Sequence, residues 1–207
     1  MNLSLLIHTF NGYEFLWNGC LESWRKSYAE YCPFYFGTDT EYHDTHNFGK
    51  FEVLYSGSGN WSDRLTTLLN KIPTDYVLYC QEDHWPTKQP PYLSEMMEIV
   101  EKYDLLRLQI SPVNRFYTMN GVEIPLFFDQ RSKYLVSHQP SIWKKSFLLE
   151  QIKYCEDPWL NEYEGTKRLN TDPKIKDRIA IYPFDWFHHA CIRGKMIPLP
   201  DSEIIPK

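Results

Sequence analysis

The first half of the chain alternates short apolar runs with longer segments in which apolar residues recur every three or four positions. Compact apolar runs bounded by polar or small residues are typical of strands, and the longer spacing is typical of helices that pack by one face. The apolar runs lie at residues 3–10, 34–36, 51–55 and 76–80. The helical stripes are Trp17, Leu21, Trp24 and Tyr28 in one segment and Leu65, Leu68, Leu69 and Ile72 in the other.

The order of these elements predicts the class of fold. The chain reads strand, helix, strand, strand, helix, strand, which favours an α/β protein with a mostly parallel central sheet and helices on both faces. Pro33 is expected to end the first helix, and either Asn60 or Ser62 to cap the second.

The second half is less regular and predicts a mixture of elements and loops. We expect helices at 92–103 and 146–155, strands at 105–110, 134–143 and 179–182, a hairpin through Asn120-Gly121 within 111–132, an acidic loop at 156–166, a solvated face or loop at 167–178 and a loose tail from 198. The chain has 207 residues and no internal repeat, so we expect a single domain.

Polar, small or acidic residues gather where the four strands of the first half end. These ends are Thr9 to Gly12, Thr38-Asp39, Ser56 to Gly59 and Gln81 to His84. Parallel strands present their carboxyl ends at one edge of a sheet, and α/β proteins bind ligands there. The sequence therefore predicts a ligand site at this edge.

Composition narrows the classes of ligand and compartment. The formal net charge of -5 argues against nucleic-acid binding, which needs a basic surface. Aromatic residues make up 16% of the chain, and we expect a few of them to line a sugar site beside the many that fill the core. The five cysteines form no CxxC pair, so we expect reduced thiols and a cytoplasmic location. Neither a signal peptide nor a membrane-spanning segment is expected.

The acidic strand end at Gln81-Glu82-Asp83-His84 is the main candidate for chemistry. Side chains alternate along an extended chain, so Gln81 and Asp83 share one face and Glu82 takes the other. A carboxylate here can hold a divalent cation, because Mg²⁺ needs only one or two protein carboxylates when phosphates and water supply the remaining ligands. Such a cation neutralises charge on a departing diphosphate. An acidic surface turn is the alternative interpretation.

Two segments carry further motifs in a definite order. Residues 60–65 (NWSDRL) precede a helix and then residues 74–83 (TDYVLYCQED), and residues 139–144 (QPSIWK) precede residues 158–162 (PWLNE). This order resembles that of small bacterial and large-virus glycosyltransferases of the GT-A type. The similarity spans roughly residues 54–85 and 134–165, and a weaker similarity is present at 193–195.

The resemblance implies an architecture and an activity. It implies a GT-A (Rossmann-like) fold in which residues 1–104 bind the nucleotide sugar, 105–197 form the acceptor and catalytic half, and 198–207 are a loose tail. It implies transfer of a sugar from a nucleoside-diphosphate sugar to a glycan or other hydroxyl acceptor. The expected reaction is inverting and assisted by Mn²⁺ or Mg²⁺.

The resemblance also implies roles for residues of the first half. Asp83 occupies the second carboxylate position of the GT-A D-x-D metal motif, whereas Gln81 stands at the first, so one carboxylate is left for the metal. Donor-binding roles fall on Thr9, Asn11, Asp39, Asp63, Arg64, Gln81, Glu82 and Lys195. Turn capping is the alternative for Asn11 and Asp39, and a surface ion pair is the alternative for Asp63-Arg64.

Glu162 matches the position of the catalytic base. An inverting transferase needs a group that takes the proton of the acceptor hydroxyl as it attacks the anomeric carbon. In the same segment Trp159 would supply a stacking wall, and Gln139 would lie on the acceptor side. The rival carboxylates are Glu156, Asp157 and Glu164. An acidic loop that faces solvent is the alternative.

Two late motifs complete the implied site. His188 and His189 are expected to add one metal ligand, because adjacent side chains on a strand point in opposite directions. A structural histidine is the alternative. Lys195, in Arg193-Gly194-Lys195, is expected to close over the diphosphate, with a surface turn as the alternative. The pair His43 and His46 lies in an apparent loop, and we interpret its spacing as chance.

Two other classes of function fit part of this pattern. A metal-dependent nucleotide-sugar phosphohydrolase would use the same acidic strand end with water as the nucleophile. A non-catalytic carbohydrate-binding domain would account for the aromatic residues, but not for an acidic strand end that follows the helix of Asp63 and Arg64.

Overall fold

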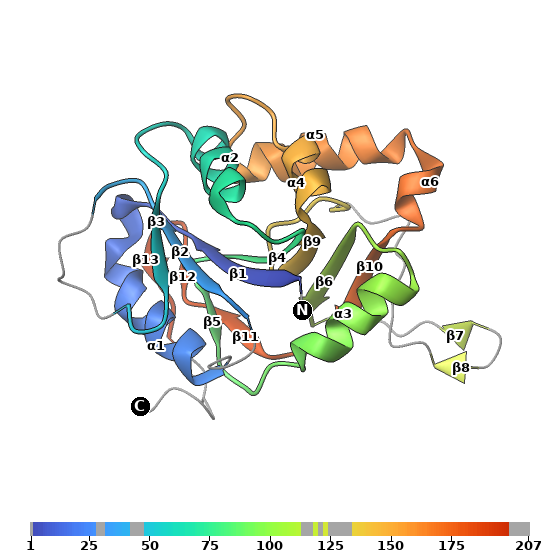
Figure 1. The fold of residues 1–207 in the computed structure, drawn as a ribbon, viewed down its shortest axis with the longest axis horizontal. Helices are drawn as coiled ribbons and strands as arrows, with labels where there is room; N and C mark the ends of the chain where they lie inside the picture. The colour runs from blue at the N-terminus through green and yellow to red at the C-terminus, as the bar shows by residue number, and fades with distance from the viewer. Residues whose placement is uncertain are drawn as a thin grey trace.

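A seven-stranded sheet with the order β10-β6-β9-β4-β1-β2-β3 forms the centre of the molecule (Figure 1). The structure is a computed structural model, and it describes residues 2–27, 32–41, 48–112, 118–119, 122–123 and 134–198. The strands are β1 (Leu3–His8), β2 (Phe34–Thr38), β3 (Glu52–Tyr55), β4 (Tyr76–Gln81), β6 (Arg107–Ser111), β9 (Ser141–Lys144) and β10 (Ile179–Pro183). Only β9 runs antiparallel to its neighbours in this sheet, so the predicted mostly parallel sheet is confirmed.

Helices cover both faces of the sheet, as predicted (Figure 1). One face carries α2 (Trp61–Lys71), α4 (Lys145–Gln151) and α5 (Pro158–Asn170), followed by the short α6 (Pro173–Lys176); the other carries α1 (Trp17–Ser27), with η1 (Asn11–Leu16) before it, and α3 (Leu93–Lys102). Side chains alternate along β1, so Leu5 and Ile7 join the core under α1 while Leu6 joins the core under α2. The continuous apolar runs of the strands follow from this burial on both faces.

The two helical stripes of the first half are buried as predicted. Their described members are at most 1% exposed, and Tyr28 lies outside the described residues. Asn60 rather than Ser62 caps α2, because its side-chain oxygen accepts the backbone N–H of Asp63 at 3.0 Å.

Three short ribbons flank the main sheet. They are β5 (His84–Pro86) with β11 (Phe187–His189), β12 (Cys191–Ile192) with β13 (Lys195–Met196), and β7 (Thr118–Met119) with β8 (Val122–Glu123). The antiparallel pairing of β7 with β8 agrees with the predicted hairpin, whose Asn120-Gly121 turn lies outside the described residues, as do His43, His46 and residues 199–207 of the predicted tail. Trp85 and Pro86 belong to β5, which pairs with β11.

The predicted strand at 134–143 is wrong over most of its length. Only its last residues belong to β9, because the backbone N–H groups before them are satisfied by side chains of α5. Val136 N–H donates to the Thr166 hydroxyl at 3.1 Å, and His138 N–H donates to the Glu162 carboxylate at 2.6 Å. The segment is therefore held beside the helix and not in the sheet.

The predicted acidic loop at 156–166 is also wrong, since most of it is helix α5. The Asp157 carboxylate caps the helix by accepting the N–H of Leu160 at 2.8 Å, and Pro158 occupies its first turn. An acidic cap followed by proline is a start signal that outweighs the irregular apolar pattern of this segment. The preceding helix ends at Gln151, earlier than predicted, and the segment 167–178 contributes the end of α5 and the whole of α6.

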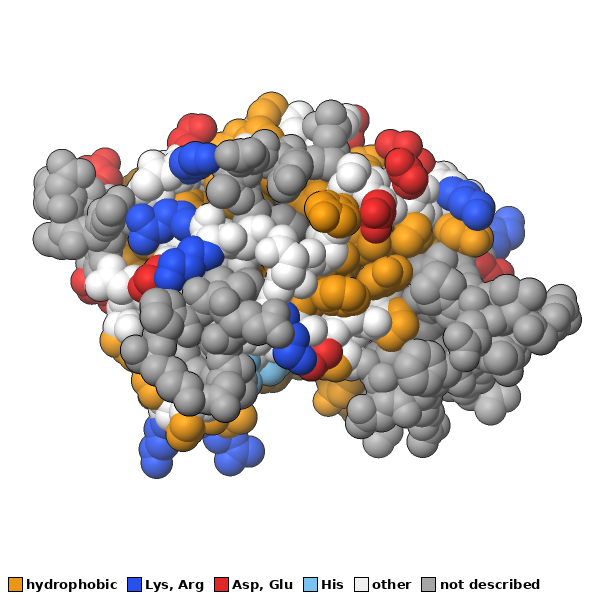
Figure 2. Space-filling model, turned by 90° about the horizontal axis from the view of Figure 1, so that it is seen from below, with side chains coloured by type: hydrophobic (Ala, Val, Ile, Leu, Met, Phe, Trp, Pro, Cys, Tyr) orange, Lys and Arg blue, Asp and Glu red, His pale blue; other side chains and the backbone are white. Residues whose placement is uncertain are grey.

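The surface carries mixed charge on the face seen in Figure 2. Lys and Arg side chains are interspersed there with Asp and Glu side chains and with hydrophobic ones. Across the part of the chain that the structure describes, no helix has the length and apolar character needed to cross a membrane. All five cysteines are free thiols.

Gly19→Ala is expected to destabilise the fold by about 1–3 kcal/mol, the usual cost of overpacking. A Cβ added to this glycine of α1 would meet the ring of Trp85 at 2.0 Å. The ring cannot easily move aside, because it is buried and its Nε1–H donates to the Glu82 carbonyl at 2.8 Å. Urea unfolding followed by tryptophan fluorescence measures the change.

Glu22→Ala, in the same helix, is the control for this substitution and should change the free energy of unfolding by about 0.5 kcal/mol or less, because its ion pair with Lys26 is an exposed i,i+4 pair. Alanine is otherwise a better helix former than glycine. A Gly19→Ala protein as stable as the wild type would therefore contradict the close packing of α1 on β5.

Candidate functional site

A pocket of about 1020 Å³ lies at the carboxyl ends of β1 and β4. Sites for small molecules and cofactors usually measure about 300–1,000 Å³, so this volume suits a ligand of nucleotide-sugar size. Its lining comes from the ends of β1 and β4, the start of α2, the segment before β9, the start of α5, and the β11–β12 connection. Strand ends far apart in the sequence thus meet at the edge predicted to bind a ligand.

The residues predicted from the sequence divide into two groups. Nine line the pocket: Thr9, Arg64, Gln81, Glu82, Asp83, Gln139, Trp159, Glu162 and His189. Five do not: Asn11, Asp39, Asp63, His188 and Lys195. The first group includes the predicted metal-binding carboxylate and the predicted base.

Asn11 and Asp39 lie outside the pocket and connect the turn after β1 to the turn after β2 by hydrogen bonds. The backbone N–H of Asn11 donates to Asp39 Oδ1 at 2.9 Å, and the Asn11 side chain contacts Thr38 and Thr40. The capping alternative accounts for this geometry, because both polar groups serve to join the ends of β1 and β2.

The other two predicted donor-binding residues outside the pocket lining are Asp63 and Lys195. Asp63 lies in the first turn of α2, where its backbone N–H bonds to the helix cap. Lys195 is exposed on β13, whereas Arg193 of the same turn does line the pocket. The donor-binding roles predicted for Asp63 and Lys195 therefore have no support in their positions.

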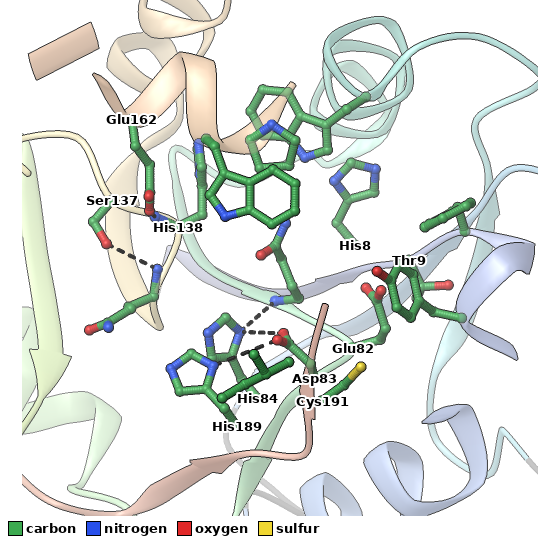
Figure 3. A pocket seen from close by; sticks show the side chains of 18 of the residues that line it. His8, Thr9, Glu82, Asp83, His84, Ser137, His138, Glu162, His189 and Cys191 are labelled. Carbon is green, nitrogen blue, oxygen red and sulfur yellow. Dashed lines mark hydrogen bonds and ion pairs between the residues drawn. The ribbon is translucent and has the colours of Figure 1, made fainter. Parts of the chain in front are cut away.

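Asp83, His84 and His189 form a cluster on one side of the pocket (Figure 3). Their candidate ligand atoms lie within 4.8 Å of one another. Asp83 Oδ1 is 3.4 Å from His84 Nδ1, and Asp83 Oδ2 is 3.6 Å from His189 Nδ1. One carboxylate and two imidazoles are a donor set that proteins use for divalent metals.

Strand register decides which of the two late histidines joins this cluster. In the antiparallel β5–β11 ribbon His189 lies opposite His84, whereas His188 lies opposite Trp85. Residues directly opposite each other project to the same face, so the rings of His84 and His189 come within 4.7 Å between centroids. Of the two histidines expected to supply one metal ligand, His189 belongs to the cluster and His188 does not. His84, which was not predicted, is the third member.

The cluster brings lone pairs together without a proton between them. His84 Nδ1 accepts the backbone N–H of Gln81 at 3.2 Å, and burial lowers the pKa of His84 to about 4, so this nitrogen carries no proton. Among the described residues no donor reaches Asp83 Oδ1, which faces it. Two such lone pairs repel each other unless a cation lies between them. The residues present therefore fit a divalent metal.

Glu82 lines the pocket although simple strand alternation predicts that it faces elsewhere. The chain already turns at Glu82 and Asp83, between β4 and β5, so alternation ends at Gln81. Burial, together with the neighbouring Asp83, raises the pKa of Glu82 to about 8. Its carboxyl group is therefore protonated at neutral pH and able to donate a hydrogen bond.

Glu162 lies across the pocket from Asp83 (Figure 3). Its Oε1 accepts the backbone N–H of His138 at 2.6 Å, and no ion pair to it is present among the described residues. Burial raises the pKa of Glu162 above the usual carboxyl value. A half-buried carboxylate with a raised pKa is suited to accept a proton.

The rival carboxylates of this segment are occupied elsewhere. Glu156 pairs with Arg168 at 2.6 Å, Asp157 caps α5, and Glu164 pairs with Lys167 at 2.8 Å on the exposed face. On helix α5, Glu162 and Glu164 point in different directions, so only Glu162 lines the pocket. Glu156 and Asp157 precede the helix.

Arg64 and Gln139 reach the pocket with fixed orientations. Arg64 Nη1 donates to the Gly59 carbonyl at 3.0 Å, and its guanidinium lies over the Phe10 ring at 5.0 Å. The side-chain oxygen of Gln139 accepts a hydrogen bond from Gln109 at 2.8 Å. Gln109 in turn accepts from the buried Arg107, so a polar network sets this wall of the pocket.

Several lining residues were not predicted from the sequence. They are chiefly His8, Trp61, His84, Gln109, Ser137 and His138. A signal was present for four of them. His8 interrupts an apolar run, Trp61 lies in the NWSDRL motif, His84 ends the acidic strand end, and His138 directly precedes Gln139. The signal for Gln109 and Ser137 is tertiary, since pairing and packing of distant segments bring them to the pocket.

Comparisons with known proteins identify the fold. TarS of S. aureus (residues 1–349), in complex with UDP-GlcNAc, matches with a TM-score of 0.57 and 16% identity over 95% of this chain and 60% of that one. UDP-glucose pyrophosphorylase complexed with UDP-glucose matches with a TM-score of 0.52 and 15% identity over 89% and 90% of the two chains. No protein-family model and no curated protein sequence matches this chain.

These likenesses place the chain in a structural class. Its fold is of the GT-A (Rossmann-like) type, which it shares with TarS and with the pyrophosphorylase. The chain spans only about 60% of the length of the TarS fragment.

Mn²⁺ is expected to bind the cluster of Asp83, His84 and His189, and His189→Ala is expected to weaken its affinity at least about tenfold. The substitution removes one of three ligand groups, and the His189 side chain is 41% exposed, so folding should tolerate the change. Isothermal titration with MnCl₂ measures the affinity.

His188→Ala is the matched control, because this neighbouring side chain belongs to the opposite face of β11 and does not line the pocket. It should bind Mn²⁺ as the wild type does. Equal losses in both variants, or no loss in His189→Ala, would contradict the assignment of the cluster.

Proposed function

We propose that the protein transfers a sugar from a nucleoside-diphosphate sugar to a hydroxyl acceptor, with inversion at the anomeric carbon. One observation carries the proposal. A cluster suited to a divalent metal and a half-buried carboxylate that forms no ion pair among the described residues lie on opposite sides of one pocket (Figure 3). Inverting transfer needs the leaving group and the attacking hydroxyl on opposite sides of the reacting carbon.

The fold supports a uridine nucleotide as the first donor to consider. TarS, a glycosyltransferase, was solved with UDP-GlcNAc and with UDP, and the pyrophosphorylase with UDP-glucose. Both proteins handle UDP-sugars on the same fold, so a UDP-sugar is the donor class that we assign.

Asp83, His84 and His189 would hold the metal. Two imidazole nitrogens favour a first-row transition metal such as Mn²⁺ over Mg²⁺, which prefers oxygen ligands. A divalent cation bound there neutralises negative charge on a diphosphate. Arg64, with its guanidinium oriented over Phe10, also lines the pocket and would add positive charge there.

The residues of the chain would act on the sugars as follows. The acceptor hydroxyl oxygen forms a bond to the anomeric carbon while the bond from that carbon to the diphosphate oxygen breaks. Glu162 takes the hydroxyl proton, and the nucleoside diphosphate leaves with the bonding electrons. Proton transfer by a placed carboxylate contributes about 10²–10⁴ to the rate of such reactions.

Other lining residues would position the two substrates. Among the described residues Thr9 Oγ1 is buried without a hydrogen-bond partner, and the buried Glu82 carboxyl group also lines the pocket, so both are suited to the hydroxyls or the base of the nucleoside. Trp159 is 71% exposed at the rim, where a ring face can stack on an incoming acceptor sugar.

Both halves of the chain would contribute to the proposed reaction. Residues 1–104 would bind mainly the donor and residues 105–197 the acceptor, although the pocket takes lining residues from both segments. The free state of all five cysteines supports a reducing compartment such as the cytoplasm.

The second candidate is nucleotidyl transfer, the formation of a UDP-sugar from UTP and a sugar 1-phosphate. The observation that favours it is the match to UDP-glucose pyrophosphorylase over about nine-tenths of both chains (89% and 90%). That reaction joins two phosphate groups and needs no base for a sugar hydroxyl. Dependence of activity on Glu162 therefore separates the two candidates.

UDP-GlcNAc or UDP-glucose with MnCl₂ is expected to raise the melting temperature of the wild type, because binding to the folded state stabilises it by mass action. Glu162→Gln should keep this shift and lose about 10²–10⁴ in transfer rate, since its amide cannot accept the proton. Thermal denaturation and UDP release with a panel of saccharide acceptors measure the two effects.

Glu164→Gln, on the exposed face of the same helix, is the control and should retain full activity. If neither UDP-sugar shifts the melting temperature, the proposed function fails. If water accepts the sugar as fast as any saccharide does, the protein is a hydrolase. If UTP and glucose 1-phosphate react while Glu162→Gln stays active, it is a nucleotidyltransferase.

The pH profile of transfer is expected to have an acid limb above the ordinary carboxyl pKa of about 4.3. Glu162 must be ionised to act as a base, and burial raises its pKa, so the rate should fall as the pH drops through that raised value and level off above it. Rates measured at saturating donor test this expectation. A limb at or below the ordinary value would contradict the assigned base.

A further inference from the structure

The floor of the pocket holds four packed rings to which the proposed transfer assigns no role. We call His8, Trp61, Tyr79 and His138 the ring cluster. Ring centroids are 4.7 Å apart for Trp61 and His138, 5.5 Å for Tyr79 and His138, and 6.2 Å for His8 and Trp61. All four residues are at most 7% exposed, so the cluster is part of the interior.

Polar atoms of this cluster lack partners. Among the described residues, His8 Nε2 and His138 Nδ1 are buried without a hydrogen-bond partner, and both residues line the pocket. Proteins rarely leave buried polar atoms unpaired, and each costs free energy when they do. Two such atoms beside one cavity indicate that a bound molecule supplies their partners.

The protonation of His138 follows from its neighbour Asn161. His138 Nε2 lies 2.9 Å from Asn161 Oδ1, an oxygen that can only accept. His138 Nε2 must therefore carry the proton. Burial lowers the pKa of His138 to about 3, so the ring is neutral and its Nδ1 is a bare acceptor.

The orientation of Asn161 is set in turn by a hydrogen-bonded chain behind it. Its Nδ2 donates to the Gln151 carbonyl at 2.8 Å and to Glu156 Oε2 at 2.6 Å, and both of these atoms are acceptors. Although burial opposes it, the hydrogen bonds from Arg168 and Asn161 keep the pKa of Glu156 below its usual value. The amide cannot flip without facing two acceptors with its own oxygen, so Arg168, Glu156 and Asn161 together fix the tautomer of His138.

The chemistry of the unpaired His138 nitrogen selects the group that it binds. With the proton on Nε2, Nδ1 can only accept a hydrogen bond. Phosphate and carboxylate oxygens, when ionised, have no proton to give to Nδ1. A sugar hydroxyl has one, and a nucleoside-diphosphate sugar carries several.

The depth of the cluster distinguishes the donor sugar from the acceptor. His138 is 2% exposed on the floor, whereas Trp159 at the rim is 71% exposed. The sugar of the nucleotide must lie between the cluster of Asp83, His84 and His189 and the Glu162 carboxylate, inside the pocket. The acceptor enters from the open rim. The sugar that reaches the floor is therefore that of the donor.

We propose that His138 is a specificity-determining residue for the donor, an inference that rests on the proposed function. Its Nδ1 accepts a hydrogen bond from one hydroxyl of the donor sugar ring, and the chain of Asn161, Glu156 and Arg168 holds the imidazole in the tautomer that permits this bond.

His138→Gln tests the proposal. A glutamine amide can take the place of Nε2 and keep the bond to Asn161, but it places no atom at Nδ1. The probe is whichever of UDP-GlcNAc and UDP-glucose binds the wild type, with UDP as the reference. Affinity for the UDP-sugar should fall about tenfold, the worth of one neutral hydrogen bond, while affinity for UDP stays unchanged. His188→Gln, outside the pocket, should bind both as the wild type does.

Monodeoxy analogues of the same UDP-sugar identify the hydroxyl without relying on the variant alone. In the wild type, one deoxy position should weaken binding about tenfold, and in His138→Gln the same analogue should bind no worse than the parent sugar nucleotide. Wild-type binding that is equal for every deoxy analogue would overturn the proposal, as would an unchanged UDP-sugar affinity in His138→Gln.

The tautomer can be checked with no ligand present. A long-range ¹H–¹⁵N spectrum of the wild-type imidazoles, assigned with His138→Gln or His138→Phe, should show Nε2 protonated and Nδ1 bare near pH 7. A proton on Nδ1 would overturn the proposal. Failure of the wild type to bind either UDP-sugar would instead refute the proposed function, so the two failures are distinguishable.

Discussion

The turn between β4 and β5 is the constraint on which the rest of the site depends. Two hydrogen bonds fix it from within: the Gln81 N–H donates to the His84 ring at 3.2 Å, and the Trp85 indole donates to the Glu82 carbonyl at 2.8 Å. A third comes from a distant segment, since the Ala190 N–H donates to the Asp83 carbonyl at 2.7 Å. The turn thereby ends the central strand, aims Asp83 into the pocket and ties the late β11 segment to the sheet edge. The Trp24 indole of α1 adds a fourth bond to the His84 carbonyl at 2.9 Å, so the core under the sheet supports the same turn.

A second set of contacts builds the opposite wall of the pocket from helix α5. The side chains of Thr166 and Glu162 hold the segment before β9 away from the sheet, and Asn161 orients His138 within it. The wall is rigid because these groups are hydrogen-bonded and, apart from the half-buried Glu162, buried, whereas the rim beside it is exposed. A rigid floor and an open rim are suited to a donor that binds deep and an acceptor that enters later.

Much of the fold follows from the sequence because its signals are local. Apolar runs, helical stripes and the Asn60 cap predict the elements of the first half, and the carboxyl-end rule predicts where the pocket opens. Prediction was wrong where local pattern and tertiary pairing disagree. Residues 134–140 have an apolar pattern typical of a strand, yet α5 takes their backbone N–H groups, and α5 itself has a stripe too irregular to be recognised without its Asp157 cap.

The sequence by itself determined that Asp83 closely follows a buried strand and that Glu162 is one of several carboxylates near Trp159, and it predicted one metal ligand from two late histidines. Only the tertiary structure decided which of these groups meet. Antiparallel register puts His189 rather than His188 opposite His84, and the pitch of α5 turns Glu162 inward while its rivals pair with Arg168 and Lys167 or cap the helix. Register and helical pitch are relations between distant segments, so no window of the sequence contains them.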